Sequence, residues 1–205
     1  MACVAVIHIR NKEVQIKIVY VGPGRGGKTT NLEYIFSKIR HRILSDMVSI
    51  KTHGDRTLFF DFLPFDLGQI RGYRIKTQLY TVPGQVKYNA TRKLVLKGVD
   101  GIVFVADSMA VMREKNMLAL KNLEENLAHY DIDLYNNFPM VMQYNKRDLS
   151  ADGVPLMDVK TMDQDLNSRL KAPFFEASAL TGDNVISTVK KAISTTIVSL
   201  QDQLA

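Results

Sequence analysis

One stretch constrains the fold of this chain more than any other, a glycine-rich run that ends in lysine and threonine: Gly22-Pro23-Gly24-Arg25-Gly26-Gly27-Lys28-Thr29. A β-branched run precedes it and a helical pattern begins near Lys28, so it has the strand–loop–helix setting of a phosphate-binding loop. Glycines lack Cβ, and the backbone can therefore turn tightly and point successive N–H groups at phosphate oxygens. The alternative is a glycine-rich turn that binds nothing, but such a turn needs neither the Lys-Thr pair nor the strand in front of it.

The residue types of this run suit a nucleoside triphosphate with Mg²⁺. Lys28 supplies a full positive charge to the β- and γ-phosphates, and the N-terminus of the following helix adds the positive end of its dipole. The Thr29 hydroxyl is a hard oxygen ligand for Mg²⁺. The residues predicted to hold the phosphates are Gly22, Gly24, Arg25, Gly26, Gly27, Lys28, Thr29 and Thr30.

Strands alternate with helices along the chain, and this order predicts one α/β domain over residues 1–205, with a mostly parallel sheet between two layers of helices. Two departures are expected: an extra N-terminal strand, and an antiparallel hairpin at the sheet edge with residues 64–72 as its turn. The expected strands are Val4–Ile9, Val14–Val21, Leu58–Leu63, Tyr73–Val82, Gly101–Ala106, Phe138–Tyr144 and Phe174–Ala177. The expected helices are Lys28–Arg42, Val86–Lys97, Val111–His129, Asp158–Leu170 and Asn184–Leu204.

Composition places the chain among soluble intracellular proteins. Cys3 is its one cysteine, which excludes a disulfide framework and suits a reducing cytoplasm. The sequence contains no apolar run long enough to cross a membrane, and its first residues do not resemble a signal peptide. The net charge of +6 is compatible with an anionic partner. However, the basic residues are scattered and not interleaved with aromatic ones, so we expect a solvated basic surface rather than a nucleic-acid site.

A second set of motifs, at the ends of two later strands, selects the base. Asn145-Lys146-Arg147-Asp148 follows one buried strand, and Glu176-Ala177-Ser178-Ala179 follows the last strand. Asp148 can accept hydrogen bonds from both N1–H and the 2-amino group of guanine, whereas adenine has no such donor pair and would leave a buried carboxylate unpaired. The motifs therefore favour GTP over ATP. Three further roles are expected here. The aliphatic stem of Lys146 lies flat under the base, and Asn145 links this loop to the phosphate loop. A backbone N–H at Ser178 or Ala179 donates to guanine O6.

With these motifs the chain resembles the Ras-like small GTPases across nearly its whole length, and within them the bacterial MglA group of polarity and gliding-motility GTPases. The closer match rests on four runs: Arg56–Pro64, Tyr80–Gln85, Leu96–Gly101 and Asn145–Leu149. The resemblance implies the Ras-like three-layer sandwich, GTP hydrolysis with Mg²⁺ and an activating partner dimer of the roadblock fold (MglB). It also implies a cytoplasmic protein that recruits effectors to a cell pole.

One position departs from the wider superfamily. Small GTPases usually carry Asp-x-x-Gly at switch II, and the resemblance puts Thr81 at the aspartate position, with Gly84 retained. A neutral hydroxyl cannot replace the charge of a carboxylate near Mg²⁺. Asp61 on the neighbouring strand is a candidate substitute, or else a solvent-facing strand residue. MglA-like proteins share the threonine, so the change does not by itself indicate an inactive enzyme.

The same resemblance assigns the catalytic residues. Gln85, directly after Gly84, matches the glutamine that orients the attacking water, and Arg56 can reach the γ-phosphate from its own chain, as the arginine of Gα subunits does. Thr57 is the candidate switch I threonine, with its oxygens on Mg²⁺ and the γ-phosphate. The alternative for Arg56 is an ordinary surface arginine.

We therefore expect a GTP-binding switch with slow hydrolysis, which a partner dimer accelerates by ordering Arg56 and Gln85. A guanine-nucleotide-binding adaptor that does not hydrolyse GTP is the main alternative, because Thr81 is atypical. The strand Leu58–Leu63 carries apolar groups on both faces, so a slide of two residues keeps the facing of each side chain. Such a slide suits a two-state element and is what the resemblance to MglA implies. The alternative is that both faces are simply buried.

Overall fold

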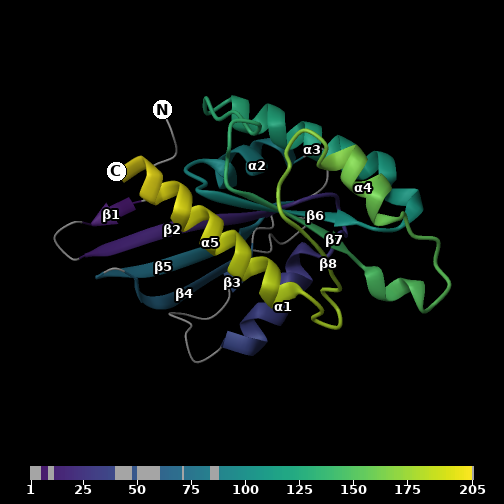
Figure 1. Ribbon diagram of the computed structural model, residues 1–205, viewed down its shortest axis with the longest axis horizontal. Coiled ribbons are helices and arrows are strands. Elements are labelled where there is room, and N and C mark those ends of the chain that lie inside the picture. The colour runs from purple at the N-terminus through teal and green to yellow at the C-terminus, as the bar shows by residue number, and fades with distance from the viewer. Residues whose placement is uncertain are drawn as a thin grey trace, which may run out of the picture.

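A β-sheet with helices on both of its faces forms the framework of the protein (Figure 1). The computed structural model describes residues 6–8, 12–39, 48–49, 61–70, 72–83 and 88–204. The strands are β1 (Val6–His8), β2 (Glu13–Val21), β3 (Val48–Ser49), β4 (Asp61–Ile70), β5 (Tyr73–Thr81), β6 (Gly101–Asp107), β7 (Met140–Asn145) and β8 (Phe174–Glu176). Their order in the sheet is β3-β4-β5-β2-β6-β7-β8, and β1 pairs with β2 outside this path.

Most neighbouring strands of this sheet are parallel. β5, β2, β6, β7 and β8 run in one direction, whereas β4 is antiparallel to both β3 and β5, and β1 is antiparallel to β2. The predicted α/β architecture, with its antiparallel hairpin and its extra N-terminal strand, is therefore confirmed. The two-residue strand β3 lies outside β4 and was not predicted from the sequence.

The helices are α1 (Lys28–Ile39), α2 (Asn89–Leu96), α3 (Arg113–Ala128), α4 (Val159–Leu166) and α5 (Val185–Leu204), with short 3-10 helices η4 (Ala110–Met112) and η5 (Arg147–Ser150). Helices α1 and α5 cover one face of the sheet, and α2, α3 and α4 cover the other (Figure 1). After α2 the chain turns at Gly98, whose φ of 68° is the left-handed conformation expected of a glycine that ends a helix.

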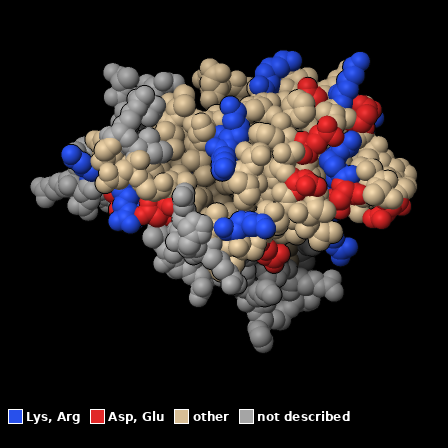
Figure 2. Space-filling view, turned by 60° about the horizontal axis from the view of Figure 1, so that its bottom comes forward, with Lys and Arg blue, Asp and Glu red and all other residues tan. Residues whose placement is uncertain are grey.

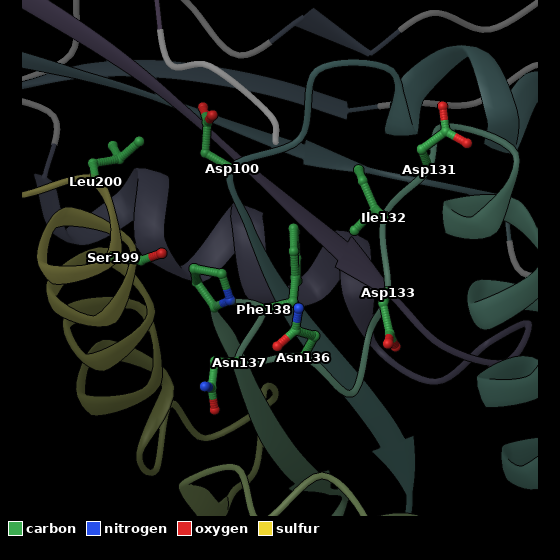
Figure 3. A pocket seen from close by; sticks show the side chains of 10 residues that line it. Asp100, Asp131, Ile132, Asp133, Asn136, Asn137, Phe138, Ser199 and Leu200 are labelled. Carbon is green, nitrogen blue, oxygen red and sulfur yellow. The ribbon is translucent and has the colours of Figure 1, made fainter. Parts of the chain in front are cut away.

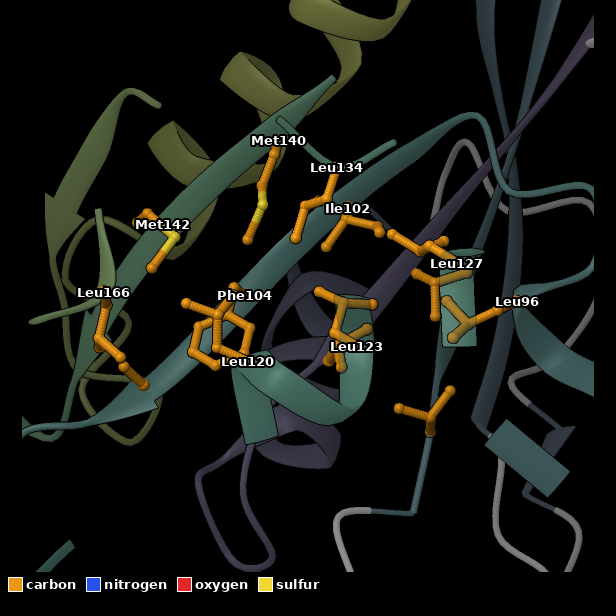
Figure 4. Close-up of a cluster of buried hydrophobic side chains, with 14 of the residues drawn as sticks. Leu96, Ile102, Phe104, Leu120, Leu123, Leu127, Leu134, Met140, Met142 and Leu166 are labelled. Carbon is orange, nitrogen blue, oxygen red and sulfur yellow. The ribbon is translucent and has the colours of Figure 1, made fainter. Parts of the chain in front are cut away.

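Alternation along the central strands divides the buried side chains into two cores. On β6, Ile102 and Phe104 point to the side of α2, α3 and α4, whereas Val103 and Val105 point to the side of α1 and α5. Figure 4 shows the first core, in which the α3 side chains that accompany these strand residues are Leu120, Leu123 and Leu127. Because both faces of these parallel strands are covered, their sequences are almost continuously apolar.

The antiparallel hairpin is longer than the sequence predicts. Residues 64–72 are expected to form its turn, but β4 continues to Ile70 and pairs with β5 as far as Ile70 and Tyr73. Pro64 predicted an early end of this strand because proline has no backbone N–H to donate to a neighbouring strand. Among the described residues β3 pairs only with the first two residues of β4, so Pro64 lies where β4 has no described neighbour on that side. A proline is tolerated at such an edge.

Apolar side chains occupy both faces of β4, as the sequence indicates. Leu63 is fully buried in the core beside α1 and α5, while the half-buried ring of Phe62 lies 4.8 Å from the ring of Tyr80 on the other face. The buried residues of β5 alternate along the strand and are Ile75, Thr77, Leu79 and Thr81. The predicted strand residues 58–60 lie outside the described part of the chain, so the slide of this strand stays a prediction.

Helix α4 ends four residues earlier than the predicted helix Asp158–Leu170. The reason is the buried side chain of Asn167, the residue after the helix. Its Nδ2 donates to Asp163 Oδ1 at 2.8 Å and to the Ala172 carbonyl at 2.9 Å, and its Oδ1 accepts from the Ala172 N–H at 2.9 Å. These bonds fold the chain back toward β8, which helical periodicity alone does not reveal.

The basic residues described on one face of the molecule do not gather into a single patch. On the face seen in Figure 2, Lys and Arg side chains stand apart from one another, and several adjoin Asp or Glu. Three of the ion pairs are Arg74–Asp66, Lys76–Glu13 and Arg113–Asp165. Of the helices in the described residues, none combines the length and the apolar character needed to cross a membrane.

Candidate functional site

The predicted site motifs meet at one edge of the sheet, outside the carboxyl ends of its parallel strands. β2 ends at Val21 before the phosphate loop, β7 ends at Asn145, and β8 ends two residues before Ser178. Parallel strands bring their carboxyl ends to the same edge, so loops that are more than a hundred residues apart in sequence come into contact there.

The phosphate loop lies directly against the neighbouring strands, and two glycines allow this. Gly22 and Gly27 have φ angles of 146° and 98°, which L side chains rarely adopt. A Cβ on Gly22 would collide with the carbonyl oxygen of Val105 in β6, and a Cβ on Gly27 would collide with the side-chain amide of Asn145. The loop can therefore close over the strand ends only with glycine at these two positions.

Lys28 lies inside this loop with its side chain buried. Its Nζ donates hydrogen bonds to the carbonyl oxygens of Gly22 at 3.0 Å and Pro23 at 2.6 Å. The ammonium charge is thus held within the curve of the glycine-rich backbone, where the sequence places it. The other residues predicted to contact phosphate precede and follow it in the chain: Gly24, Arg25, Gly26, Thr29 and Thr30.

Asn145 joins the phosphate loop to the loop after β8. Its Nδ2 donates to the Gly26 carbonyl at 2.7 Å, and its Oδ1 accepts from the Ala179 N–H at 2.8 Å. The side chain is 1% exposed, and both ends of the amide are used, so its orientation is fixed. The Asn145 side chain, at the end of β7, therefore connects the phosphate loop to the loop after β8.

Lys146 is anchored by a carboxylate that the sequence analysis missed. Its Nζ pairs with Asp107, at the end of β6, at 2.6 Å. Asp107 is fully buried, and Asn116 of α3 holds its backbone, accepting from the Asp107 N–H at 2.9 Å and donating to its carbonyl at 2.8 Å. The aliphatic stem of Lys146 is therefore held between two strand ends. The sequence contains one signal for this contact: Asp107 is a carboxylate that directly follows the predicted buried strand Gly101–Ala106.

The carboxylate predicted to select the base, that of Asp148, is open to a ligand. Asp148 lies half-buried in η5, and its carboxylate has no hydrogen bond or ion pair within the part of the chain that the structure describes. Ser178 is buried and its hydroxyl accepts from the Thr181 N–H at 3.1 Å, which shapes the neighbouring loop. The Ala179 N–H donates to Asn145, so a contact from this N–H to guanine O6 stays a prediction and requires that the N–H be shared.

Several predicted residues cannot be placed. Those outside the described part of the chain are Arg56, Thr57, Gly84 and Gln85. Thr81 ends β5, pairs with Tyr20 of β2 and is 2% exposed, so it lies beside the strand that leads into the phosphate loop. Asp61 begins β4 opposite Ser49, and its side chain lies outside the described residues.

The described residues fit a guanine nucleotide. The phosphate loop offers a buried ammonium group within a curve of backbone that Gly22 and Gly27 allow to lie against the strand ends, and the base side offers the unpaired carboxylate of Asp148. Thr29, with Thr57, would hold Mg²⁺, which supplies positive charge to the β- and γ-phosphates when bound.

A cavity among the described residues lies away from this site. It has a volume of about 250 Å³ and is found where β6 and β7 begin, next to the end of α5 (Figure 3). Its lining includes Asp100, Phe138, Pro139 and Ser199, and none of the phosphate-loop or base-loop residues. Burial raises the pKa of the Asp100 carboxyl to about 6, although one of its oxygens accepts from the Lys17 N–H at 2.7 Å. This cavity is therefore separate from the candidate site.

Comparison with known proteins agrees with the geometry. The sequence model of the Ras family matches residues 17–198. The chain is also 49% identical over 195 residues to the Mutual gliding-motility protein MglA of Myxococcus xanthus (strain DK1622), a match that covers 95% of this chain and 97% of MglA. Proteins of the Ras family bind guanine nucleotides, generally with Mg²⁺. The chain therefore belongs to the Ras family of GTPases, and within it to the group of MglA.

Proposed function

We propose that this protein is a GTP-hydrolysing switch that controls cell polarity or gliding motility. The observation that carries the proposal is the unit built by Asn145, which joins the phosphate loop to the base loop and leaves the Asp148 carboxylate open to guanine. The similarity to MglA of Myxococcus xanthus, a gliding-motility protein by name, supports the assignment to motility.

The chemistry of the switch depends on residues in the two predicted switch segments. Gln85 orients the attacking water, and Arg56 neutralises charge that develops on the γ-phosphate. Thr57 senses Mg²⁺ and the γ-phosphate, so that hydrolysis releases the segment that carries it. Thr29 and Lys28 hold the metal and the phosphates in both states.

Hydrolysis by the isolated protein is slow, and a roadblock-fold partner dimer of the MglB kind accelerates it by ordering Arg56 and Gln85. The GTP-bound form recruits polarity or motility effectors from the cytoplasm to a cell pole. Neither nucleic acid nor a membrane span has a part in this function.

A second candidate is an adaptor that binds GTP without hydrolysing it. The observation in its favour is Thr81, a buried neutral residue at the end of β5 where most small GTPases carry an aspartate. Mg²⁺ would lose the negative charge that this aspartate usually places nearby. Gln85 and Arg56 favour the enzyme over the adaptor.

GTP turnover with and without a roadblock partner distinguishes the two candidates. We expect partner-stimulated hydrolysis by the wild-type protein, and its loss in Arg56→Ala and in Gln85→Ala while GTP binding is retained. The in-chain arginine is expected to supply on the order of 10³-fold, about 4 kcal/mol. Absence of turnover with the partner present would favour the adaptor. Normal stimulated turnover in Arg56→Ala would make Arg56 a surface residue.

A further inference from the structure

Strand β7 directs two amide side chains, not one, toward the phosphate loop. Gln143 and Asn145 are alternate residues of β7 and therefore lie on the same face of the sheet. Gln143 is fully buried and Asn145 is 1% exposed. Asn145 reaches the Gly26 carbonyl directly, as described above, while Gln143 acts on the next peptide group of the loop through an intermediate residue.

That intermediate residue is Asn31, in the first turn of α1 and 1% exposed. Gln143 Nε2 donates to Asn31 Oδ1 at 2.9 Å, and Asn31 Nδ2 donates to the Gly27 carbonyl at 2.9 Å. The donor from Gln143 occupies the oxygen of the Asn31 amide, so the amide nitrogen must face the loop. The Gly26 carbonyl is thereby held by a side chain of β7. The Gly27 carbonyl, which also accepts from the backbone N–H of Asn31 at 3.0 Å, is held in addition by a side chain that Gln143 orients.

The direction of these carbonyls fixes the direction of the N–H groups that a phosphate would meet. In a planar trans peptide the C=O and the following N–H point to opposite sides. Holding the Gly26 carbonyl toward β7 therefore turns the Gly27 N–H away from it. Holding the Gly27 carbonyl does the same for the Lys28 N–H. Both groups belong to the stretch of loop whose N–H groups are predicted to cradle phosphate.

Stability alone does not explain the Gln143–Asn31 pair. Gln143 Oε1 is buried and has no hydrogen-bond partner among the described residues, and an unpaired buried acceptor lowers stability. Two apolar side chains of similar shape would fill the same space without leaving that oxygen unpaired, and such replacements are often neutral or stabilising.

We propose that Gln143 and Asn31 are positioning residues for the phosphates of the bound nucleotide. Gln143 acts through Asn31, and the pair holds the Gly27–Lys28 peptide with its N–H toward the phosphates, as Asn145 does for the peptide before it. The inference rests on the proposed binding of GTP and GDP. It predicts an effect on phosphate binding and none on recognition of the base, because Asp148 lies outside the pair.

Dissociation of a fluorescent GDP analogue from the full-length protein tests this proposal. Gln143→Met keeps the volume of the side chain and removes its donor. Asn31→Leu removes the side-chain bond to the Gly27 carbonyl and leaves the backbone bond from residue 31 in place. We expect each variant to release GDP roughly tenfold faster, which corresponds to about 1.4 kcal/mol. We expect the double variant to release it no faster than Asn31→Leu alone, because Gln143 acts only through Asn31.

Val141→Ala is the matched control, because Val141 is a fully buried residue two positions earlier on the same face of β7. We expect it to lower the melting temperature while leaving GDP release within about twofold of wild type. Gln143→Met should do the opposite, with a melting temperature near that of wild type and faster release. The preference for GDP over inosine diphosphate should be unchanged in Gln143→Met.

Three results would overturn the inference: release from Gln143→Met within twofold of wild type, effects of the two substitutions that multiply in the double variant, or an altered preference between GDP and inosine diphosphate. Failure of the wild-type protein to retain the GDP analogue would instead contradict the proposed function, so the two failures can be told apart.

Discussion

Strand β7 is paired on both sides, and all six of its residues are buried. Strand β4, by contrast, pairs with β5 along its length, but among the described residues only its first two pair with β3. The side chain of Asn145 in β7 also donates a hydrogen bond to the phosphate loop. β4 has a bulge between Asp66 and Gly68, and its second half is partly exposed. The two strands lie on opposite sides of β2.

This difference indicates that the two sides of the sheet have different roles. The clamped half, which we define as β6, β7, β8 and the loops that follow them, holds the phosphate loop and fixes the groups that are predicted to bind the base. In the β4–β5 hairpin, β5 is paired on both sides, but β4 is paired with β3 at only two of its residues among those described. β4 also follows directly on the segment that carries Arg56 and Thr57. Substitutions at the candidate nucleotide site should therefore change nucleotide affinity strongly. Substitutions in β4 should change the mobility of this strand only slightly.

The largest effect is expected for Lys28→Ala, in the loop that the clamped half holds. No other nearby side chain of this loop is a flexible point charge that can reach the β- and γ-phosphates. We expect the affinity for GTP to fall by about 1000-fold or more, or about 4 kcal/mol, in a titration with a fluorescent GTP analogue. Lys38→Ala is the control, since it removes a positive charge from the exposed end of the same helix. A near-normal titration of Lys28→Ala would contradict the role given to the loop.

The next largest effect concerns Asp148, where the clamped half meets the base. In Asp148→Asn the new amide donates where the carboxylate accepted, so xanthosine nucleotides should replace guanine nucleotides as ligands. We expect GTP affinity to fall on the order of 100-fold, or about 3 kcal/mol, while affinity for xanthosine triphosphate rises. Asp152→Asn, which changes an exposed carboxylate four residues later, should leave both affinities unchanged. Equal GTP affinity in wild type and Asp148→Asn would remove the guanine assignment.

The sequence predicts the clamped half better than it predicts the details of the hairpin. The buried strands are apolar runs that end in recognisable motifs, so the positions of Asn145 and Asp148 follow from local pattern alone. The pairing of Lys146 with Asp107 depends on the register of β6 and β7, which places Asp107 opposite Asn145 and which local pattern does not contain. In β4, cross-strand pairing with β5 outweighs the turn signals of Pro64 and Gly68.

An unfavourable buried charge lies directly before β6, far from the candidate nucleotide site. Asp100 is 6% exposed there, and burial raises its pKa from 3.8 to about 6. Between about pH 4 and pH 6 the folded protein therefore binds a proton more readily than the unfolded chain does, so the free energy of unfolding should fall as pH rises through this window. At 1.36 kcal/mol per pKa unit, the loss at pH 7 is on the order of 2–3 kcal/mol.

Urea unfolding between pH 4 and pH 7, at a constant excess of GDP, measures this dependence. Asp100→Asn should flatten the dependence, whereas Asp131→Asn, which changes an exposed carboxylate at the same cavity, should keep it. A wild-type protein whose stability rises from pH 4 to pH 7, or an Asp100→Asn variant with the same pH profile as wild type, would show that Asp100 is not the group responsible.

The smallest effect concerns the mobility of β4. Asp66 stabilises the bulge of this strand. Its Oδ1 accepts a hydrogen bond from the Gly68 N–H at 2.7 Å, and its other carboxylate oxygen pairs with Arg74 of β5. These contacts, chiefly the bond from Gly68, hold the pKa of Asp66 below its usual range. A slide of β4 by two residues along β5 would have to break the pair with Arg74. Asp66→Ala should therefore make β4 easier to move.

Amide hydrogen exchange should show a rise of about two- to fourfold in Asp66→Ala, confined to β4 and β5, since an exposed ion pair contributes little. Asp165→Ala breaks a similarly exposed pair with Arg113, between α3 and α4, and should leave exchange in β4 unchanged. Equal exchange in β4 and β7 of Asp66→Ala would contradict the division between the two halves. Structures with GDP and with a GTP analogue extend the test: if Phe62 faces Tyr80 in both, β4 does not slide, and the switch must operate through the segments around it.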